Sequence, residues 1–277
     1  MRNQPLQIGF IGTGTMGAML IRALLRANTV SATNIWAANR SQARLESLAA
    51  EFTGLHSADS SRVAAASEIL FLCVKPADVP DVLQQIRNQL RDDQVCVFLT
   101  NVFSFQEIEA RIPCRAAKLI PTIAQQVARG VALLSYGARI ARADSIALEN
   151  LLSATGRVLV VPEKHLRIFA DVASCGPAFL AACIEELCLQ AAKKAPGVSA
   201  SDLTKAAIET LAATAELLRS GLSPGDLVRQ VAVPGGMTEA GLRTLRQSLP
   251  QAIAAVLEAT DAAERRKRET TSFDLRR

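Results

Sequence analysis

The sequence has few aromatic residues and almost no histidine. Trp, Tyr and Phe together make up 4% of its 277 residues, and the two histidines are His56 and His165. So few aromatic side chains are untypical of a protein that stacks on nucleic-acid bases. With only these two histidines, and with His165 near an expected domain junction, we expect no histidine to act as a catalytic base.

The cysteines form no C-x-x-C pair and show no zinc-ligand spacing, so we expect no metal site. They stand mostly in apolar runs, which indicates reduced core residues: Cys73, Cys96, Cys114, Cys175, Cys183 and Cys188. A signal peptide and a long apolar run are also missing. Residues 1–5 lead directly into a strand-like stretch, and no uninterrupted run approaches the roughly 18 residues that span a membrane. We therefore expect a cytoplasmic protein that contacts neither membranes nor nucleic acid.

The charge of the chain is modest. The formal net charge is +5, and part of the excess lies in the run from Arg265 to Arg268 and in the pair Arg276 and Arg277. Basic residues at a helix C-terminus offset the helix dipole. Such a tail is typical of a solvated helix end rather than of a nucleic-acid-binding arm.

What the chain does contain is apolar residues in two different patterns. In the first half, strand-like runs separated mostly by helical segments occupy residues 8–11, 35–38, 69–74, 95–99, 116–120, 131–134 and 156–161. Continuous apolar strands alternating with helices predict a parallel sheet covered on both faces. We expect residues 1–162 to form one α/β domain of this doubly wound kind.

From Glu163 onward the pattern is helical throughout. We expect helices over about 164–193, 200–220, 225–232, 238–247 and 250–269, so residues 163–277 should form an all-α domain. So much apolar surface in so few residues predicts a partner subunit that covers it. We expect a homodimer through this helical half.

The first strand-like run feeds a glycine turn that opens a helix. Gly12 allows the tight turn, Gly14 lets the backbone approach phosphates, and Gly17 lets the helix pack close to the strand. Unpaired N–H groups at the helix N-terminus would hold a pyrophosphate. The turn therefore predicts a Rossmann-type dinucleotide site with contacts from Ile11, Gly12, Thr13, Gly14, Thr15, Met16 and Gly17.

The end of the second strand decides which dinucleotide is expected. Asn39, Arg40 and Ser41 stand where a site for NAD usually has Asp or Glu. Arg40 offers a planar fork of donors that matches a 2′-phosphate, whereas an acid would repel it. This favours NADPH (NADP+) as the cofactor, the alternative being that Arg40 is a solvated loop residue.

Two further strand ends carry candidate residues. Lys75 ends the strand 69–74, and ligands of doubly wound sheets bind at the carboxyl ends of the strands. Its alternative interpretation is a strand-end lysine beside a proline that stops the strand. Besides the turn and Asn39–Ser41, the expected cofactor contacts are Ser60, Cys73, Val74, Lys75, Pro76, Thr100 and Asn101.

A Pro-Gly-Gly turn leads straight into a helix near residue 238. Gly235 and Gly236 would present backbone N–H groups to a carboxylate or to a polarised substrate nitrogen, and Thr238 adds a hydroxyl. The alternative is an N-capping threonine in a loop between two helices.

The order of these motifs resembles that of the pyrroline-5-carboxylate reductase family, over nearly the whole chain. The motifs are the glycine turn, Asn-Arg-Ser, Val-Lys-Pro, Gly176-Pro177-Ala178 at the start of a long helix, and Pro-Gly-Gly-x-Thr. The resemblance implies hydride transfer from NADPH to the C=N bond of a small cyclic imine, pyrroline-5-carboxylate giving L-proline. It also implies a homodimer, with larger rings of dimers in some members. Thr238 and Lys75 are then the candidate catalytic residues, and the implied substrate contacts are Pro121, Thr122, Cys175, Gly176, Val233, Gly235, Gly236, Met237 and Thr238.

The chain departs from the family pattern on the substrate side. The family usually has Met-Pro-Asn-Thr-Pro-Ala where this chain reads Ile-Pro-Thr-Ile-Ala-Gln over 120–125. Val233 replaces a common serine, which adds bulk and removes a hydrogen-bond donor, and Met237 replaces a small residue. Loss of one hydrogen bond to a charged group costs about 1.5–3 kcal/mol. A related imine is therefore also expected as a substrate.

Two other functions remain open. A hydroxy-acid dehydrogenase of similar architecture would need a base such as Lys193 or Lys194, but the G-x-x-G-x-G-x-x-x-K pattern of those enzymes is absent. A cofactor-binding regulatory protein without turnover would be consistent with the altered substrate motifs.

Overall fold

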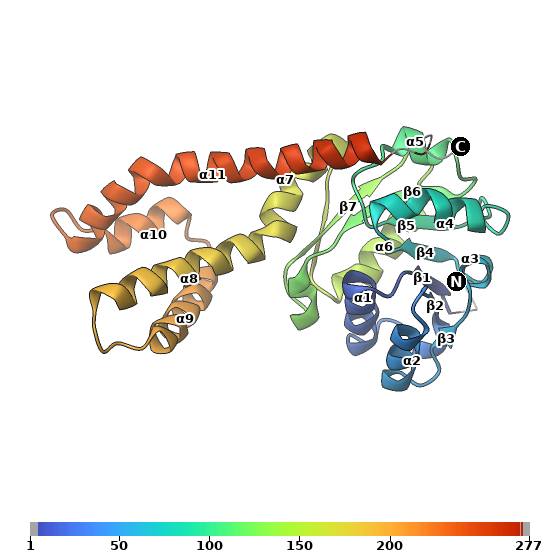
Figure 1. Ribbon diagram of the computed structural model, residues 1–277, viewed down its shortest axis with the longest axis horizontal. Coiled ribbons are helices and arrows are strands. Elements are labelled where there is room, and N and C mark those ends of the chain that lie inside the picture. The colour runs from blue at the N-terminus through green and yellow to red at the C-terminus, as the bar shows by residue number, and fades with distance from the viewer. Residues whose placement is uncertain (1–4, 272, 274–277) are drawn as a thin grey trace. The chain divides into compact units, whose positions relative to one another are not determined.

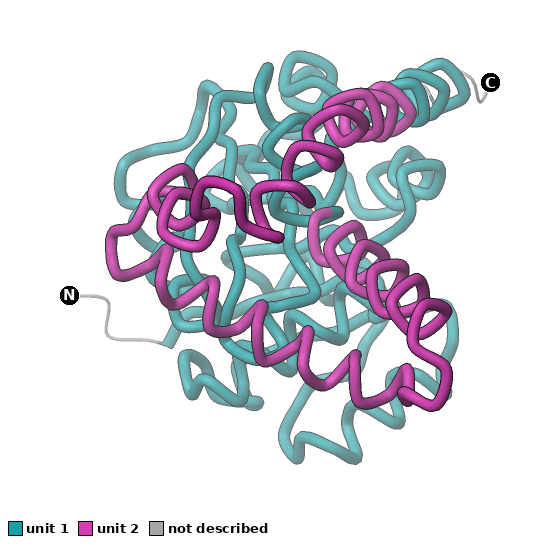
Figure 2. Tube along the Cα trace, turned by 90° about the vertical axis from the view of Figure 1, so that its left-hand side faces the viewer, with its two compact units in different colours: residues 1–175, 261–277 teal, residues 176–260 magenta. Residues whose placement is uncertain are grey.

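The computed structural model describes residues 5–271 and 273, and it divides into two compact units. One unit comprises residues 1–175 with 261–277, and the other comprises residues 176–260 (Figure 2). The first four residues and the basic pair Arg276–Arg277 lie outside the described residues. The domain boundary expected at residue 162 stays a prediction.

The first unit is built on one sheet of eight strands in the order β3-β2-β1-β4-β5-β6-β7-β8 (Figure 1). All neighbouring strands are parallel except β6 and β7. The mostly parallel sheet confirms the expected fold class. The strands are β1 (Ile8–Ile11), β2 (Ile35–Ala38), β3 (His56–Ser57), β4 (Ile69–Leu72), β5 (Val95–Phe98), β6 (Arg115–Ile120), β7 (Val131–Tyr136) and β8 (Arg157–Val160).

Two features of the sheet differ from the expectation. β7 runs antiparallel to β6 because the segment that joins them contains only the short 3-10 helix η3 (Ile123–Val127), which is not a crossover helix. β3 was not expected, since its two residues, His56 and Ser57, are exposed and too few to form an apolar run.

Helices cover both faces of this sheet. Successive residues of a strand point to opposite faces, so Phe71 packs in one core cluster while Leu70 and Leu72 pack in the other. The first face is covered by α1 (Thr15–Arg26), α2 (Gln42–Glu51) and α6 (Arg142–Ser153). The second is covered by α3 (Ser60–Ala66), α4 (Val79–Ile86) and α5 (Phe105–Glu109). Short 3-10 helices also occur at η1 (Ala32–Asn34), η2 (Pro76–Asp78) and η4 (Glu163–His165).

The second half of the chain is helical, as expected. Its helices are α7 (Leu166–Ala170), a π-helical turn (Asp171–Cys175), α8 (Gly176–Lys194), α9 (Ala200–Arg219), α10 (Pro224–Val231) and α11 (Met237–Thr270). The expectation of two helices over 238–247 and 250–269 is wrong, because α11 continues through Pro250. The Ala-, Leu-, Glu- and Arg-rich segments on both sides favour helix and outweigh the hydrogen bond that proline cannot make.

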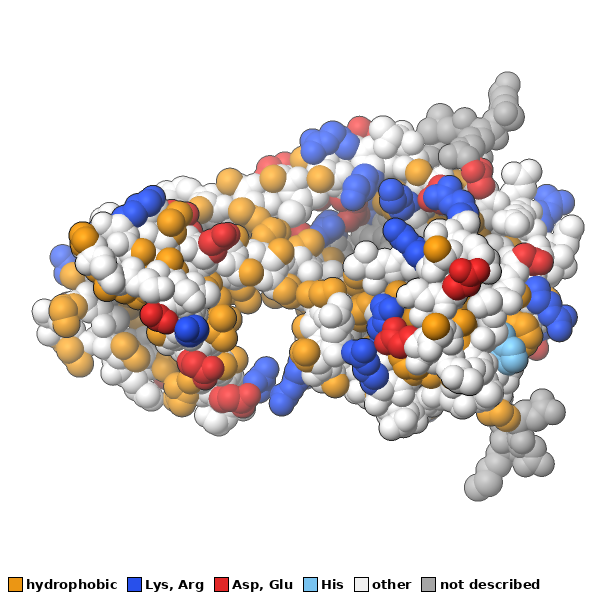
Figure 3. All heavy atoms as spheres, turned by 60° about the horizontal axis from the view of Figure 1, so that its bottom comes forward, with side chains coloured by type: hydrophobic (Ala, Val, Ile, Leu, Met, Phe, Trp, Pro, Cys, Tyr) orange, Lys and Arg blue, Asp and Glu red, His pale blue; other side chains and the backbone are white. Residues whose placement is uncertain are grey.

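The unit of residues 176–260 has almost no buried core of its own. Cys188 is the single buried hydrophobic residue within it. Large apolar side chains on its helices are instead exposed, among them Leu180, Leu187, Leu189, Ile208, Leu217 and Ile253. Apolar side chains are visible over this unit in the space-filling view (Figure 3). Cys183 is exposed too, so the expectation of core cysteines is wrong for this residue.

One apolar stretch is longer than the sequence led us to expect. The continuous helical segment Glu163–Lys194 contains an 18-residue window with a mean hydropathy of 1.5, of which 11% is buried. By length and composition alone such a helix could cross a membrane. A search for uninterrupted apolar residues overlooks this segment because single polar residues are spaced among the apolar ones.

Gln94 joins two elements of the sheet unit through its buried amide. Its Nε2 atom donates to the carbonyl oxygens of Ala64 at 2.7 Å and Ser67 at 2.6 Å, and its Oε1 atom accepts from the Arg91 N–H at 2.8 Å. Gln94 is fully buried directly before β5, while Ala64 lies in the last turn of α3 and Ser67 is its C-cap. The amide therefore satisfies backbone groups that water does not reach.

We expect Gln94→Leu to lower the free energy of unfolding by about 2 kcal/mol, because buried carbonyl groups lose their donor. Urea unfolding followed by circular dichroism measures the change. Gln84→Leu, on the exposed side of α4, is the matched control and should leave the midpoint in place. Equal midpoints for Gln94→Leu and the parent protein would contradict this account.

Candidate functional site

The glycine turn between β1 and α1 leaves no room for side chains at two positions. Gly12 has a φ of +98°, and a Cβ atom there would lie 2.7 Å from the carbonyl oxygen of Cys73. A Cβ atom on Gly17 would lie 2.1 Å from the carbonyl oxygen of Gly12. Gly14 is the N-cap of α1 and has an extended backbone. A Cβ atom on Gly14 would lie 3.7 Å from Nη1 of Arg44, which is an ordinary contact distance. The first turn of α1 is thus held directly above the end of β1.

Asn39 fixes the turn to the end of the second strand. The Thr13 N–H donates to its Oδ1 atom at 3.2 Å, and its Nδ2 atom donates to the Ser41 carbonyl oxygen at 3.2 Å. The Gly12 N–H donates to the carbonyl oxygen of Ala38 at 2.8 Å. The end of β2 and the glycine turn are therefore one hydrogen-bonded structure.

A hollow of about 330 Å³ lies over the ends of β1, β2 and β4. It brings together nine of the residues expected to contact the cofactor: Ile11, Gly12, Gly14, Asn39, Arg40, Ser60, Cys73, Val74 and Lys75. We call it the cofactor hollow. Sequence reasoning missed Arg44, Asp78, Asp81, Val82 and Gln85, which also line it. Arg44 stands in the first turn of α2, four residues after Arg40, and its place at the start of the helix that follows β2 could have identified it.

The charged lining of the cofactor hollow consists of Arg40, Arg44, Lys75, Asp78 and Asp81. The Arg40 side chain is 89% exposed, and its Nη2 atom lies 3.5 Å from Oδ2 of Asp78. So exposed an ion pair contributes little stability, and Arg40 can exchange it for another anion. Arg44 has no carboxylate partner within the described part of the chain. The residues present therefore fit a dinucleotide with an extra phosphate on its ribose.

The other expected cofactor residues lie around this hollow or away from it. Thr13 and Thr15 line a neighbouring hollow between α1 and α2, while Met16 and Gly17 are in the first turn of α1. Ser41 is the N-cap of α2, and Pro76 begins η2 after the exposed Lys75. Thr100 is buried, and its Oγ1 atom accepts from the Val102 N–H at 3.1 Å.

Asn101 belongs to a cluster of charged groups at the end of β5. Its Nδ2 atom donates to Oε1 of Glu264 at 3.0 Å, and its carbonyl oxygen accepts from Nη2 of Arg268 at 2.7 Å. Its Oδ1 atom also accepts from Nζ of the buried Lys118 at 3.4 Å. Both groups of the Asn101 amide are therefore already occupied by protein partners.

Lys118 is the most deeply buried charge of that cluster. Its Nζ atom lies 2.5 Å from Oε1 of Glu163, which also accepts from the Phe105 N–H at 2.8 Å. Burial lowers the pKa of Lys118 below its ordinary value, although the Glu163 carboxylate acts in the opposite direction. The ion pair holds the start of the helical segment against β6.

Among the expected substrate residues, those after β6 are mostly buried. Thr122 is buried, and its hydroxyl has no hydrogen-bond partner. The carbonyl oxygen of Pro121 accepts from Oγ of Ser174 at 2.8 Å, next to Cys175 in the π-helical turn. Gly176 begins α8 and is buried. The hydroxyl of Thr122 is therefore buried in the protein interior rather than exposed at the surface.

The Pro-Gly-Gly turn uses its own N–H groups internally. The Gly235 N–H donates to Oε2 of Glu239 at 2.7 Å, and the Gly236 N–H donates to the carbonyl oxygen of Val233 at 3.0 Å. The expectation that these two N–H groups face a ligand therefore differs from the structure. Pro234 and Thr238 are exposed, and so are the larger apolar side chains Val233 at 59% and Met237 at 94% exposure.

Within residues 5–271 and 273, no group of three or more His, Cys, Asp or Glu side chains is arranged to hold a metal ion.

Two family descriptions match separate segments of the chain. Residues 163–270 match the family described as pyrroline-5-carboxylate reductase dimerisation, and residues 7–101 match the one described as NADP oxidoreductase, coenzyme F420-dependent. The ComE operon protein 4 of Bacillus subtilis (strain 168) is 27% identical over 92% of this chain and 94% of its own. A pyrroline-5-carboxylate reductase of Methanosarcina acetivorans is 29% identical over 97% of this chain and 98% of its own.

The fold is also that of a solved structure. The crystal structure of Plasmodium falciparum pyrroline carboxylate reductase with NADP bound superposes with a TM-score of 0.83 at 21% sequence identity. The match covers 98% of this chain and 100% of the other. The two chains share one architecture from end to end.

We expect Glu163→Gln to destabilise the protein at neutral pH, because the buried Lys118 loses its counter-ion. The Glu163 side chain is 36% exposed, so solvent screening reduces the expected loss to about 1–2 kcal/mol of unfolding free energy. The loss should shrink as the pH rises toward the ordinary lysine value, because the folded pKa of Lys118 is lowered and a neutral amine needs no carboxylate.

Urea unfolding at a series of pH values measures this difference between variant and parent. The same substitution in a Lys118→Met background is the control, and it should have no pH-dependent effect. A loss that stays constant with pH, or that persists in the Lys118→Met background, would show that the charge of Lys118 is not its cause.

Proposed function

We propose, from the premise that this chain belongs to the pyrroline-5-carboxylate reductase family, that it is an NADPH-dependent reductase of a small cyclic imine. The family membership makes it an oxidoreductase that uses NAD(P). The main support for an NADPH-dependent reductase is the cofactor hollow, in which a glycine turn and two arginines lie together at the ends of β1 and β2.

NADPH is the cofactor that suits this hollow. Gly12, Gly14 and Gly17 let the backbone and the first turn of α1 approach a pyrophosphate. Arg40 and Arg44 supply guanidinium groups for a 2′-phosphate, and Asp78 is the single acid that pairs with either of them in the described chain. Because that pair is exposed, a phosphate dianion can replace Asp78 on Arg40 at little cost.

The proposed substrate is pyrroline-5-carboxylate, reduced to L-proline, or a related cyclic imine. When bound, NADPH supplies the hydride. We assign to Thr238 the orientation of the imine nitrogen by a hydrogen bond, and to Lys75 a place beside the cofactor. A threonine is a weak acid, so Thr238 would contribute through positioning and electrostatic stabilisation.

The turn before Thr238 bears on the identity of the imine. Val233 and Met237 expose apolar side chains, and the N–H groups of Gly235 and Gly236 are already hydrogen-bonded. Fewer donors are therefore free to bind a carboxylate than the sequence suggested. This favours activity toward imines that lack a carboxylate, beside pyrroline-5-carboxylate itself.

We further propose that the chain functions as a homodimer through its helices. The unit of residues 176–260 buries a single hydrophobic residue, Cys188, and a unit of this size needs a covered apolar surface to remain folded. The family description that matches residues 163–270 is itself a dimerisation domain. The apolar face of the segment Glu163–Lys194 would then be covered by the partner subunit rather than by lipid.

A second function has one observation in its favour. The ComE operon protein 4 matches this chain over nearly its full length, and its name refers to an operon rather than to a reaction. Together with the altered substrate turn, this supports a regulatory protein that binds the cofactor without turnover as the alternative.

Arg40→Gln should raise the KM for NADPH about ten- to hundredfold while the KM for NADH stays within about twofold, because one charge-assisted contact to the 2′-phosphate is lost. The two KM values, or the two dissociation constants from NADPH and NADH fluorescence, measure this change. Arg87→Gln, an exposed arginine at the end of α4, is the control. Equal losses for both cofactors would contradict a role of Arg40 in phosphate recognition.

A panel of cyclic imines tests the proposed reaction. Purified protein with NADPH should reduce pyrroline-5-carboxylate or the uncharged 1-pyrroline, followed by the loss of absorbance of NADPH. Thr238→Ala should lower kcat by about tenfold or more and leave the NADPH dissociation constant unchanged. Tight NADPH binding with no turnover over the whole panel would favour the regulatory alternative, and equal kcat for Thr238→Ala would remove Thr238 from the mechanism.

A further inference from the structure

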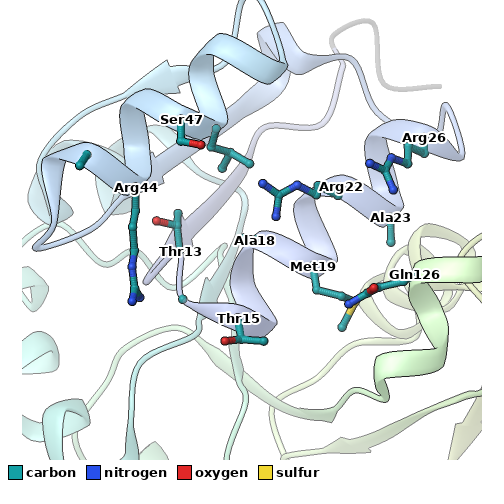
Figure 4. Close-up of a pocket in the computed structure, with 13 residues that line it drawn as sticks. Thr13, Thr15, Ala18, Met19, Arg22, Ala23, Arg26, Arg44, Ser47 and Gln126 are labelled. Atoms are coloured by element: carbon teal, nitrogen blue, oxygen red, sulfur yellow. The ribbon is translucent and has the colours of Figure 1, made fainter.

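A second hollow lies between α1 and α2, behind the glycine turn (Figure 4). Its volume is about 600 Å³, and its polar lining consists mainly of Thr13, Arg22, Arg26, Arg44, Ser47 and Gln126. We call it the α1–α2 groove. It shares only Gly14 and Arg44 with the cofactor hollow. The two hollows are therefore neighbours that meet at one side chain.

The groove carries an excess of positive charge. Three of its lining residues are arginines, and none is acidic. Glu51 lies nearby and pairs with Arg22 at 2.7 Å and with Arg26 at 3.4 Å. Arg44 has no carboxylate partner within the described chain. Three guanidinium groups against one carboxylate leave two positive charges uncompensated.

A buried hydroxyl in the groove lacks a partner. Thr13 is 3% exposed, and its Oγ1 atom makes no hydrogen bond, although its N–H is bound by Asn39. An unpaired polar atom in the interior carries a free-energy cost that a bound acceptor or donor removes. Figure 4 shows Thr13 in the groove wall, with Arg44 and Ser47 coming from α2 and Arg22 coming from α1.

We propose that the α1–α2 groove binds a phosphorylated small molecule that is distinct from the dinucleotide cofactor. The two uncompensated positive charges would balance the double negative charge of a phosphate monoester. The planar guanidinium groups also match the geometry of phosphate oxygens. The floor of the groove is apolar, formed by Ala18, Met19, Ala23 and Leu48, and it suits the organic part of such an ester. Ser47 and Gln126 add polar side chains to the lining.

Occupation of the groove would be linked to the cofactor hollow through shared structure. Arg44 lines both hollows, and Thr13 stands between the groove and Asn39. A phosphate bound to Arg44 in the groove therefore reduces the positive charge and the number of N–H donors that Arg44 has left for the 2′-phosphate of the cofactor. By linkage, each ligand must alter the affinity of the other by the same factor.

Calorimetric titration with phenyl phosphate tests this inference, first on the free protein and then with saturating NADPH. The ester should bind in both states. Arg22→Gln/Arg26→Gln should weaken its binding about tenfold or more, while NADPH affinity stays unchanged. Glu51→Gln should strengthen it, because both arginines are released from their carboxylate. Arg87→Gln should have no effect.

The opposite signs expected for these variants separate a charge effect from damage to the fold. Weaker binding in Glu51→Gln, or equal binding in all variants, would overturn the proposal. Binding of phenyl phosphate only when NADPH is absent would also overturn it, because the groove would then be part of the cofactor site. If NADPH itself fails to bind, the proposed cofactor is wrong, and the titration of the free protein still reports on the groove.

Discussion

The contact between α1 and the end of β1 is the constraint on which the ligand-binding side of this molecule depends. Gly17 lies so close to the carbonyl oxygen of Gly12 that any side chain at position 17 would push the helix away from the sheet. Because the helix stays close, its N-terminus faces the edge where β1, β2 and β4 end. The cofactor hollow, the anchoring of Thr13 by Asn39 and the α1–α2 groove all follow from that one placement.

Charged side chains of the sheet unit are paired in one region and largely unpaired in another. In β6, the buried Lys118 pairs directly with the partly exposed Glu163, and Asn101, Glu264 and Arg268 extend the network to the last turns of α11. The buried Lys118 charge needs this carboxylate beside it, so the pair favours one arrangement of β6 and the segment that begins at Glu163. At the ligand edge, Arg40 and Arg44 remain exposed or lack a carboxylate partner among the described residues. The first arrangement stabilises the fold, and the second keeps positive charge available to an anion.

Local patterns were sufficient for most of the fold and for part of the site. Buried parallel strands need continuous apolar residues, so β1, β4 and β5 could be read from the sequence, and their ends necessarily meet at one edge. The direction of β7 could not, because it depends on how the short segment after β6 is folded. The continuation of α11 through Pro250 depends on the balance of propensities over many residues. These two features are set by more than a local motif.

The same distinction holds for the candidate site. Gly12, Asn39, Arg40 and Lys75 line one hollow because each follows a strand of the same sheet. Asn101 also follows a strand, but its amide is bound to Glu264, a residue far along the chain that no spacing rule connects with it. The N–H groups of Gly235 and Gly236 were expected to be free, yet Glu239 and Val233 already accept from them. Partners of this kind become visible only in the folded chain.

The near absence of a core in residues 176–260 has a thermodynamic consequence of its own. A segment that buries only Cys188 among its hydrophobic residues gains little free energy from folding alone, so its order must come from whatever covers it. If a second copy of the chain supplies that cover, as proposed, the stability of residues 176–260 rises with the concentration of the chain, whereas that of the sheet unit does not. On that proposal, the apolar helices of residues 176–260 stay uncovered in a newly made chain until it meets a second copy.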